Sequence, residues 1–543
     1  MMWMLIFWGC TGSKDTVDWS GDITLVSDAE MALFCETATT VEGDLSLEGI
    51  EVATLGSLSC LTAVGGSLTV ISSPGLTDIS LPALTSLGGE LYIADNAALA
   101  DISGLAALTT ATSVVITDNP ALSDISGLTA LPAIEDLLSL SANPALSDIS
   151  GLSALTAAGR LSLVGSDALT GLSGLALLTD LSGLTVEECA ALTGLDALSS
   201  LSSVAGDVRI STNDSLTGLG GLSGLSSITG SLSIQSNPVL TSIAGLAALS
   251  DLGGDLSLYD NDALTSTDGL SSITALSGSL SIVDNSALDN LSGFSALTTI
   301  DGSLLISGGG LSEAELAVLS SIGGDLTIRD ADGLTDLSLA ALTTLGGDLA
   351  IERCDGLLDL SGFSGLTSLS GDVLLCDSDS LIGISGLTAL TSAGTVEVCS
   401  SSALTGITGF SALTTTSGLL ITDNDALTDL SGFSALTTPG ALKIHDNDAL
   451  LHLDDLTAVR EISDTLSIRY SESLLSVEGL HGVTAVGGDL KVTHNTALGD
   501  VAGENLLAAI GEDNVVGEAS IKDNFPTDDT GSPPDSGAVD TGK

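Results

Sequence analysis

The chain has few aromatic residues and few basic ones. Only 2% of its 543 residues are aromatic, so a core must be built from Leu, Ile, Val and Ala within the 44% that are hydrophobic. Lysine and arginine number 11 against 70 aspartates and glutamates, which gives a net charge of −59. Because this charge repels phosphates, nucleic acid is excluded as a partner. The acidic balance favours solubility and association with cations.

Cysteine is also scarce, and no pair has CxxC spacing. Seven cysteines in a chain of this length do not form a disulfide framework, and their spacing argues against a zinc site. Cys35 and Cys60 lie near the first repeats, where they either form a disulfide that closes this end or remain two buried thiols. Cys376 and Cys399 hold the same position in consecutive repeats, so neighbouring strands about 4.8 Å apart would bring the two thiols together.

Long apolar runs are absent apart from residues 1–9, which precede Cys10. This run is too short to span a bilayer. It resembles the end of a bacterial lipoprotein signal, in which a cysteine after a small residue is lipidated, and Gly9 fits that position. Phe7 and Trp8 are bulkier than the usual residues, and no Lys or Arg precedes them. The interpretation is a leader and short linker over residues 1–20, lipidated at Cys10; an ordinary secretory leader and an apolar start of a cytoplasmic chain are the alternatives.

A repeat of 22 to 24 residues fills most of the chain. The copy from Gly278 to Ile300 contains a Leu-x-Ile strand, an Asn, and then apolar residues spaced by three. The first apolar strand residue recurs at 22 positions, and only the last interval, of 29 residues, falls outside the range. These positions are Ile23, Leu45, Leu68, Leu91, Val114, Leu138, Leu161, Leu184, Val208, Leu232, Leu256, Leu280, Leu304, Leu326, Leu349, Val373, Val396, Leu419, Leu442, Leu466, Leu490 and Ala519. The constant spacing predicts strands stacked in register, and hence an all-β, right-handed parallel β-solenoid of about 22 turns over residues 21–524.

The rest of each repeat has the period of neither an α-helix nor a strand. Leu288, Leu291, Phe294, Leu297 and Ile300 recur every three residues, which predicts an irregular or 3₁₀-like arc with one side turned inward. A glycine before most strands is expected to permit the sharp corner that re-enters the sheet. These glycines are Gly43, Gly66, Gly89, Gly254, Gly278, Gly324, Gly347 and Gly488.

An asparagine follows many of the strands, three residues after the Leu-x-Ile core. An inward amide satisfies backbone groups at a corner that lacks ladder partners, and stacked amides would form a ladder that sets the register. We interpret this row as structural, with Cys189 and Cys354 as small buried substitutes. The ladder comprises Asn96, Asn119, Asn143, Asn213, Asn237, Asn261, Asn285, Asn424, Asn447 and Asn495, with Asn524 at its end.

A stack of strands has two open ends that must be capped. Ser27–Glu30 is a capping-box pattern that predicts a short helix over the first repeat, and residues 505–510, closed by Gly511, predict a second helix. A further capping-box pattern at Ser312–Glu315 is read as a junction within the array. Residues 525–543, rich in Pro, Gly, Ser, Thr and Asp, are expected to form a disordered acidic tail.

The repeats beginning at Gly254 (GDLSLYDNDAL) and Gly418 (GLLITDNDALTDLSGF) resemble receptor L-domain repeats. These are the leucine-rich, right-handed β-helical modules of insulin- and epidermal-growth-factor-type receptors. Similar repeats occur in fungal cell-wall proteins and bacterial surface proteins. The resemblance covers about residues 21–524 and implies an extracellular recognition or wall-associated role. No motif matches the ligand-contact residues of the receptors, so no ligand site is carried over.

Two groups of charged residues are candidate binding sites. Aspartates flank several repeat asparagines, as at Asp260 and Asp262, and stacked carboxylates leave calcium binding open beside solvated turn residues. No other cofactor is expected. The scarce basic residues cluster late, on one face of the last strands, and form a candidate contact for an anionic partner such as an acidic glycan or lipid headgroup; the alternative is neutralisation of nearby acids. They are Lys443, His445, Arg469, Lys491 and Lys522.

Because the repeats are uniform, no long loop is available to form the sides of a catalytic cleft. No catalytic motif is present either, so we expect no enzyme activity. The expected function is binding or adhesion at the cell surface by a monomeric outer-membrane lipoprotein in the cell envelope, attached to the membrane only through a lipid anchor. The partner would be an unidentified surface protein or glycan. The alternatives are a purely structural envelope spacer and a β-helical enzyme acting on polysaccharides.

Overall fold

A computed structural model describes residues 19–524 of the chain, so Cys10, most of the leader and the acidic tail lie outside the described residues. The described part divides into two compact units. The first ends at Leu192 and adds Asp196–Leu201, and the second comprises Thr193–Leu195 and the residues from Ser202 onward.

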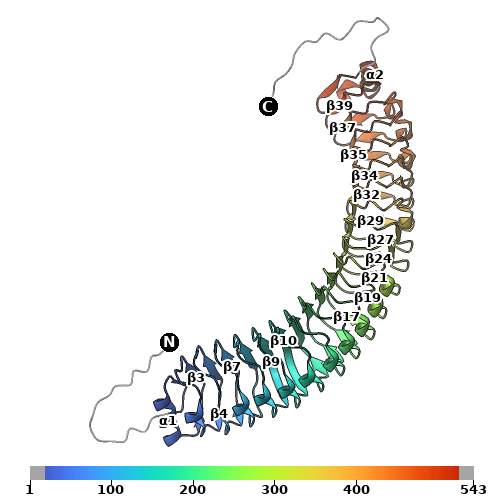
Figure 1. Cartoon of the computed structure of the whole chain (residues 1–543). Coiled ribbons are helices and arrows are strands. Elements are labelled where there is room, and N and C mark those ends of the chain that lie inside the picture. The colour runs from blue at the N-terminus through green and yellow to red at the C-terminus, as the bar shows by residue number, and fades with distance from the viewer. Residues whose placement is uncertain (1–18, 525–543) are drawn as a thin grey trace, which may run out of the picture. The chain divides into compact units, whose positions relative to one another are not determined.

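The first unit is built on eight parallel strands stacked in chain order (Figure 1). Their register joins Ile23 to Leu45 at one end and Leu161 to Leu184 at the other. Each register position is one that the repeat spacing predicts. The strands are β1 (Ile23–Leu25), β3 (Leu45–Glu48), β5 (Leu68–Ile71), β7 (Leu91–Ala94), β8 (Val114–Thr117), β9 (Ala133–Ser141), β10 (Ala157–Val164) and β12 (Gly183–Glu187).

The second unit continues the same pattern with fourteen parallel strands, from Val208 paired with Leu232 to Leu490 paired with Ala519 (Figure 1). The two units together contain 22 strands of this kind, so the predicted parallel stacking is confirmed for the described residues. The strands are β14 (Val208–Ser211), β16 (Leu232–Gln235), β18 (Leu256–Tyr259), β20 (Leu280–Val283), β22 (Leu304–Ser307), β25 (Leu326–Arg329), β28 (Leu349–Glu352), β30 (Val373–Cys376), β32 (Ser392–Cys399), β34 (Thr415–Thr422), β35 (Thr438–His445), β37 (Leu466–Arg469), β39 (Leu490–Thr493) and β40 (Ala519–Lys522).

The core lies inside each turn and is almost entirely aliphatic. Leu280 and Ile282 of β20 are buried, whereas Ser281 between them faces outward and is half-buried. Leu291 and Phe294 of the arc are also buried, in agreement with the predicted inward period of three. Each fully buried side chain of this kind contributes about 1.5–3 kcal/mol, and stacking makes the burial continuous from turn to turn.

The arc contains 3₁₀ helices, as predicted, but it also contains short strands, which the sequence pattern did not indicate. Thr299–Ile300 (β21), for example, pairs with Ala275–Leu276 (β19) and with Ser321–Ile322 (β24). These pairings form because stacked turns place the same backbone segments side by side. The 3₁₀ helices are η1 (Gly56–Leu58), η2 (Ser103–Leu105), η3 (Ser126–Leu128), η4 (Ser150–Leu152), η5 (Ser173–Leu175), η6 (Asp196–Leu198), η7 (Gly220–Leu222), η8 (Ala244–Leu246), η9 (Asp268–Leu270), η10 (Ser292–Phe294), η11 (Ser361–Phe363), η12 (Ser431–Phe433), η13 (Asp454–Leu456), η14 (Glu478–Leu480) and η15 (Glu512–Asn514). The other short strands are β2 (Thr40–Val41), β4 (Ala63–Val64), β6 (Ser86–Leu87), β11 (Asp180–Leu181), β13 (Ser203–Val204), β15 (Ser227–Ile228), β17 (Asp251–Leu252), β23 (Glu313–Glu315), β26 (Asp336–Ser338), β27 (Thr344–Leu345), β29 (Ser368–Leu369), β31 (Gly383–Ile384), β33 (Gly406–Ile407), β36 (Glu461–Ile462) and β38 (Ala485–Val486).

The glycines before the strands serve a different purpose from the one predicted. None of the eight has a positive φ, so conformational freedom is not the reason for glycine there. A Cβ added at Gly254 would lie 2.6 Å from the Ser231 hydroxyl of the preceding turn, which accepts a hydrogen bond from the Asp255 backbone N–H at 3.1 Å. Glycine is therefore needed to leave room for a hydrogen-bonding side chain. The left-handed residue of the turn lies after the strand instead, as at Asp260 with φ 54°.

Helices lie near both ends of the described strand array. In α1 (Asp28–Thr37), Ser27 caps the Glu30 N–H as predicted, and Met31 and Phe34 are buried. In α2 (Asp500–Ile510), Gly511 ends the helix with φ 87°, as predicted. The predicted start of α2 at residue 505 was wrong, because the Asp500 carboxylate accepts hydrogen bonds from Asn524 and fixes an earlier turn of helix.

The capping-box pattern at Ser312–Glu315 does not begin a helix. Residues 313–315 form β23, which pairs in parallel with β26 (Asp336–Ser338). The Ser312 hydroxyl donates to the Asp289 carboxylate at 2.8 Å rather than capping a helical N–H. The array thus stays in strand geometry here, because a neighbouring backbone offers ladder partners.

Candidate functional site

The asparagine row forms a buried ladder inside the turns. The Asn261 amide donates to the carbonyls of Tyr259 at 3.0 Å and Ile234 at 2.9 Å. Its oxygen accepts from the Asn237 backbone N–H at 3.2 Å, and the Asn285 oxygen accepts from the Asn261 side chain at 3.3 Å. Each amide thus joins its own turn to both neighbours and satisfies backbone groups that the sheet leaves open. All ten asparagines in the predicted row, and Asn524, are buried.

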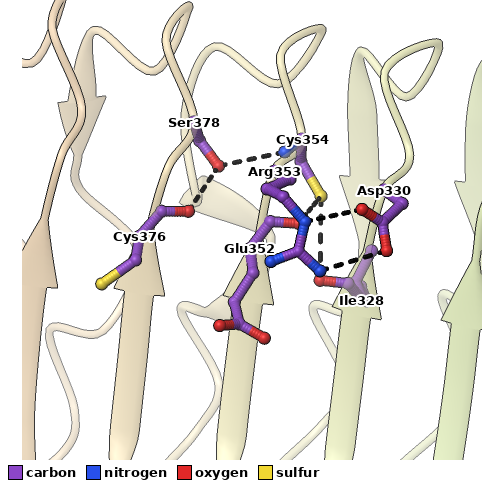
Figure 2. Close-up of polar contacts among 7 residues, drawn as sticks. All are labelled: Ile328, Asp330, Glu352, Arg353, Cys354, Cys376 and Ser378. Atoms are coloured by element: carbon purple, nitrogen blue, oxygen red, sulfur yellow. Dashed lines mark hydrogen bonds and ion pairs between the residues drawn. The ribbon is translucent and has the colours of Figure 1, made fainter.

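At Cys354 and Ser378, cysteine and serine replace asparagine and still join neighbouring turns (Figure 2). The Cys354 backbone N–H donates to the Ser378 hydroxyl at 3.2 Å, and its thiol donates to the carbonyls of Ile328 and Glu352 at 3.7 and 3.4 Å. Burial raises the pKa of the Cys354 thiol to about 11, and does the same for Cys189. Both cysteines therefore remain protonated donors at neutral pH and are poor nucleophiles.

The other four described cysteines form two disulfides. Cys35 of α1 is bonded to Cys60, with their Cα atoms 5.6 Å apart. Cys376 at the end of β30 is bonded to Cys399 at the end of β32, with Cα atoms 4.5 Å apart. The second disulfide joins two consecutive turns at equivalent positions of the sheet.

The acidic residues beside the ladder make hydrogen bonds to hydroxyl groups of adjacent turns. Asp260 accepts from the Ser236 hydroxyl at 3.0 Å, and Asp262 accepts from Ser286 at 2.5 Å. On the same side of the turns, Arg353 forms an ion pair of 2.6 Å with Asp330 and lowers the pKa of that carboxyl (Figure 2). These contacts supply turn-to-turn partners for the carboxylates.

The late basic residues lie in two outward rows across β35, β37, β39 and β40. One row reads Lys443, Ser467, Lys491 and Ser520, and the other reads His445, Arg469, Thr493 and Lys522. The residues between these rows, such as Ile444 and Ile468, are buried. Because alternate strand residues face opposite sides, the structure brings all five predicted basic residues to one surface, which we call the basic face.

Two of the five basic residues already interact with neighbouring side chains. Lys491 forms an ion pair of 2.5 Å with Asp489, which lowers the pKa of that carboxyl. His445 hydrogen-bonds Ser467 at 2.8 Å, and burial, with smaller contributions from Arg469 and Lys443, lowers the His445 pKa to about 4. His445 is therefore neutral at physiological pH and adds no charge to the basic face.

The other three basic residues keep free charge. Lys443, Arg469 and Lys522 form no ion pair with any residue in the described range, and the Arg469 Nε is buried without a hydrogen-bond partner there. Beside them Tyr470 stacks on His494 with ring centroids 4.7 Å apart, which the sequence did not single out. The basic face thus offers three cationic side chains next to an aromatic pair, on a chain that is otherwise strongly acidic.

The structure defines this chain as a leucine-rich parallel β-solenoid. No protein-family model matches it, and no curated protein matches it in sequence. Among solved structures it is similar to TLR13 in a complex with ssRNA13, at 14% identity and a TM-score of 0.31, over 90% of this chain and 85% of that one. A leucine-rich repeat protein of Leptospira interrogans has 14% identity and a TM-score of 0.22, over 75% of this chain and 90% of that one. At these TM-scores neither likeness bears on function, and the class assignment rests on the strand pairing.

No helix among residues 19–524 is long and apolar enough to cross a membrane.

Proposed function

We propose that this protein is a non-enzymatic binding protein of the cell envelope, a right-handed receptor L-domain-type solenoid whose contact surface is the basic face. The observation that carries the proposal is that three cationic side chains, Lys443, Arg469 and Lys522, lie on one side of the sheet and form no ion pair within residues 19–524. In a chain with a net charge of −59, unpaired cations on a single face favour an anionic partner at that place. The anionic partner that we propose is an acidic glycan, because its repeated carboxylate or sulfate groups can pair with several cations at once.

The test is binding of the full chain to immobilised polyuronate and sulfated glycans, with the double variant Lys443→Glu/Arg469→Glu. We expect roughly five- to tenfold weaker binding for the variant and a steep loss of wild-type binding with added salt, because surface charges contribute about 0.2–1 kcal/mol each and are screened. Arg329→Glu is the matched control, since Arg329 holds the same outward strand position on β25, away from the basic face. Equal binding by the double variant, or equal weakening by the control, would refute the proposal.

A structural spacer is the second candidate, favoured by the nearly constant repeat length and by the similarity of the stacked turns. A spacer would bind none of the glycans yet lose its envelope function when shortened by whole repeats. Attachment through a lipidated Cys10 in the outer membrane belongs to both proposals, and mass spectrometry of the mature N-terminus tests it.

A further inference from the structure

Three side chains of the type that binds metals meet on the outward side of β30 and β32. Cys376 and Cys399 are register partners at the ends of these strands. Glu397 lies two residues before Cys399, so it faces the same side of the sheet. The two sulfur atoms and a carboxylate oxygen of Glu397 all lie within 4.8 Å of one another. This is the one group of three such side chains among residues 19–524.

Glu397 is unusual at its position. In the 22 strands this outward position holds mainly Ser or Thr, and Glu397 is its only acidic residue. Its register neighbours are Leu374 and Leu420, and its half-buried carboxylate makes no hydrogen bond or ion pair with a described residue. This carboxylate is therefore available as a ligand for a bound cation.

The cysteines supply the softer ligands. Cys376 is only 2% exposed, and Cys399 is half-buried, so both sulfurs are partly screened from solvent. Glu352 is the other register neighbour of Cys376, but Figure 2 shows the Cys376 sulfur directed away from it. The available set is therefore two sulfurs and one carboxylate.

We propose that Cys376, Cys399 and Glu397 bind one Zn²⁺, or a divalent cation of similar softness, when the disulfide is reduced. A dithiol reductant gives two electrons and two protons to the disulfide, breaking the S–S bond into two thiols, and is itself oxidised to a disulfide. Metal binding then releases the two thiol protons, because thiolates are the ligands. In a tetrahedral site with Zn–S bonds of about 2.3 Å the two sulfurs would lie about 3.8 Å apart, so the two cysteine side chains must rotate apart after reduction, and water completes the tetrahedron.

The metal and the disulfide exclude each other, since both states use the same two sulfurs. Binding of the metal must therefore oppose oxidation, and oxidation must release the metal. The site is thus a metal site controlled by the redox state of one cross-turn disulfide. It does not depend on the basic face or on the proposed function.

The test uses the full chain, reduced with dithiothreitol, freed of reductant under anaerobic conditions and titrated with Co²⁺ as a spectroscopic probe for zinc. We expect one equivalent of cobalt with thiolate-to-cobalt charge-transfer absorption in the reduced chain and none in the oxidised chain. Glu397→Gln should retain the absorption and bind at least tenfold more weakly, whereas the control Glu352→Gln should bind as the wild type does. Zinc should also slow reoxidation of the reduced chain.

The variant Cys376→Ser/Cys399→Ser should lose the absorption while keeping the Cys35 and Cys60 thiols. Absorption that persists in this variant, no absorption in the reduced wild type, or unchanged affinity in Glu397→Gln would each overturn the proposal. If the double variant does not fold, the oxidised wild type and Glu397→Gln, which both keep the strands intact, decide the question.

Discussion

Asn261 allows the energetic role of the buried ladder to be measured. Replacing Asn261 with Ala leaves the Asn237 backbone N–H without a hydrogen-bond acceptor, because no other acceptor is present among the described residues. It also removes the amide bonds to the Ile234 and Tyr259 carbonyls, although the latter keeps the Ser236 N–H as a donor at 2.9 Å. One orphaned N–H costs about 1–3 kcal/mol and each lost carbonyl bond about 0.5–1.5 kcal/mol, so Asn261→Ala should cost roughly 2–6 kcal/mol.

Asn261→Ser provides the comparison, because serine already occupies this corner elsewhere. The Ser73 hydroxyl accepts from the Ile50 N–H at 2.9 Å and donates to the Ile71 carbonyl at 3.1 Å. A serine at position 261 should therefore keep the corresponding two bonds and lose the amide bonds to the Ile234 carbonyl and the Asn285 side chain. We expect a cost of about 1–2 kcal/mol, smaller than that of alanine.

The assay is amide hydrogen exchange in β16, β18 and β20, because long repeat arrays need not unfold in two states. A difference of about 2 kcal/mol between the alanine and serine variants corresponds to roughly thirtyfold faster exchange in the alanine variant. Exchange rates in distant strands are the internal control, since each turn contacts only its neighbours. Equal protection in the two variants, or wild-type protection with alanine, would refute the view that the ladder satisfies backbone groups.

Three further predictions concern the backbone, the half-buried His445 and the N-terminal disulfide. Ala142 has φ 50°, so Ala142→Gly should relieve backbone strain and raise local stability by about 0.5–1 kcal/mol. Asp260→Gly should not raise stability, because it removes the hydrogen bond that Asp260 accepts from Ser236. A lower Tm for Ala142→Gly would contradict this prediction. The folded pKa of His445 is about 4, below the unfolded value of about 6.5, so the unfolded chain takes up this proton first and stability falls as pH drops from about 6.5 to 4. Because His445 is half-exposed, we expect about 1–2 kcal/mol, and His445→Gln should remove that part of the pH dependence in urea unfolding at pH 7 and 4.5; an unchanged pH dependence would argue against it. The Cys35–Cys60 disulfide has a sequence separation of 25, so Cys35→Ser/Cys60→Ser should cost about 3 kcal/mol and speed proteolysis around α1; unchanged cleavage would show that α1 stays docked without the bond.

The strand positions were predictable because one local rule is repeated at nearly constant spacing. Leu232, Leu256 and Leu280 pair in the predicted register, since equal repeat lengths bring equal residues side by side. The inward asparagines were predictable for the same reason. The start of α2 was not, because it depends on the contact between Asp500 and Asn524, which is a tertiary contact rather than a local pattern.

The candidate sites were only partly predictable. The sequence places Arg469 and Lys491 on one face. It does not show that Asp489 neutralises Lys491, or that the Arg469 Nε has no hydrogen-bond partner within residues 19–524. The spacing of Cys376 and Cys399 argued against a zinc site, because a motif such as CxxC describes only residues that are close in the sequence. Glu397 joins them only when strands 23 residues apart are laid side by side.

The sequence by itself therefore determined the architecture: the aliphatic core, the stacking of parallel strands and the row of buried amides. These features follow from the periodicity that every turn shares, because burial of the same apolar positions stabilises each turn in the same way. The tertiary structure decided what is specific to this chain: why glycine precedes the strands, which cations remain unpaired, how far the His445 pKa falls and which carboxylate meets the two cysteines. Those properties depend on distances between side chains of neighbouring turns and on their burial, and neither is set by a residue's own position in the repeat.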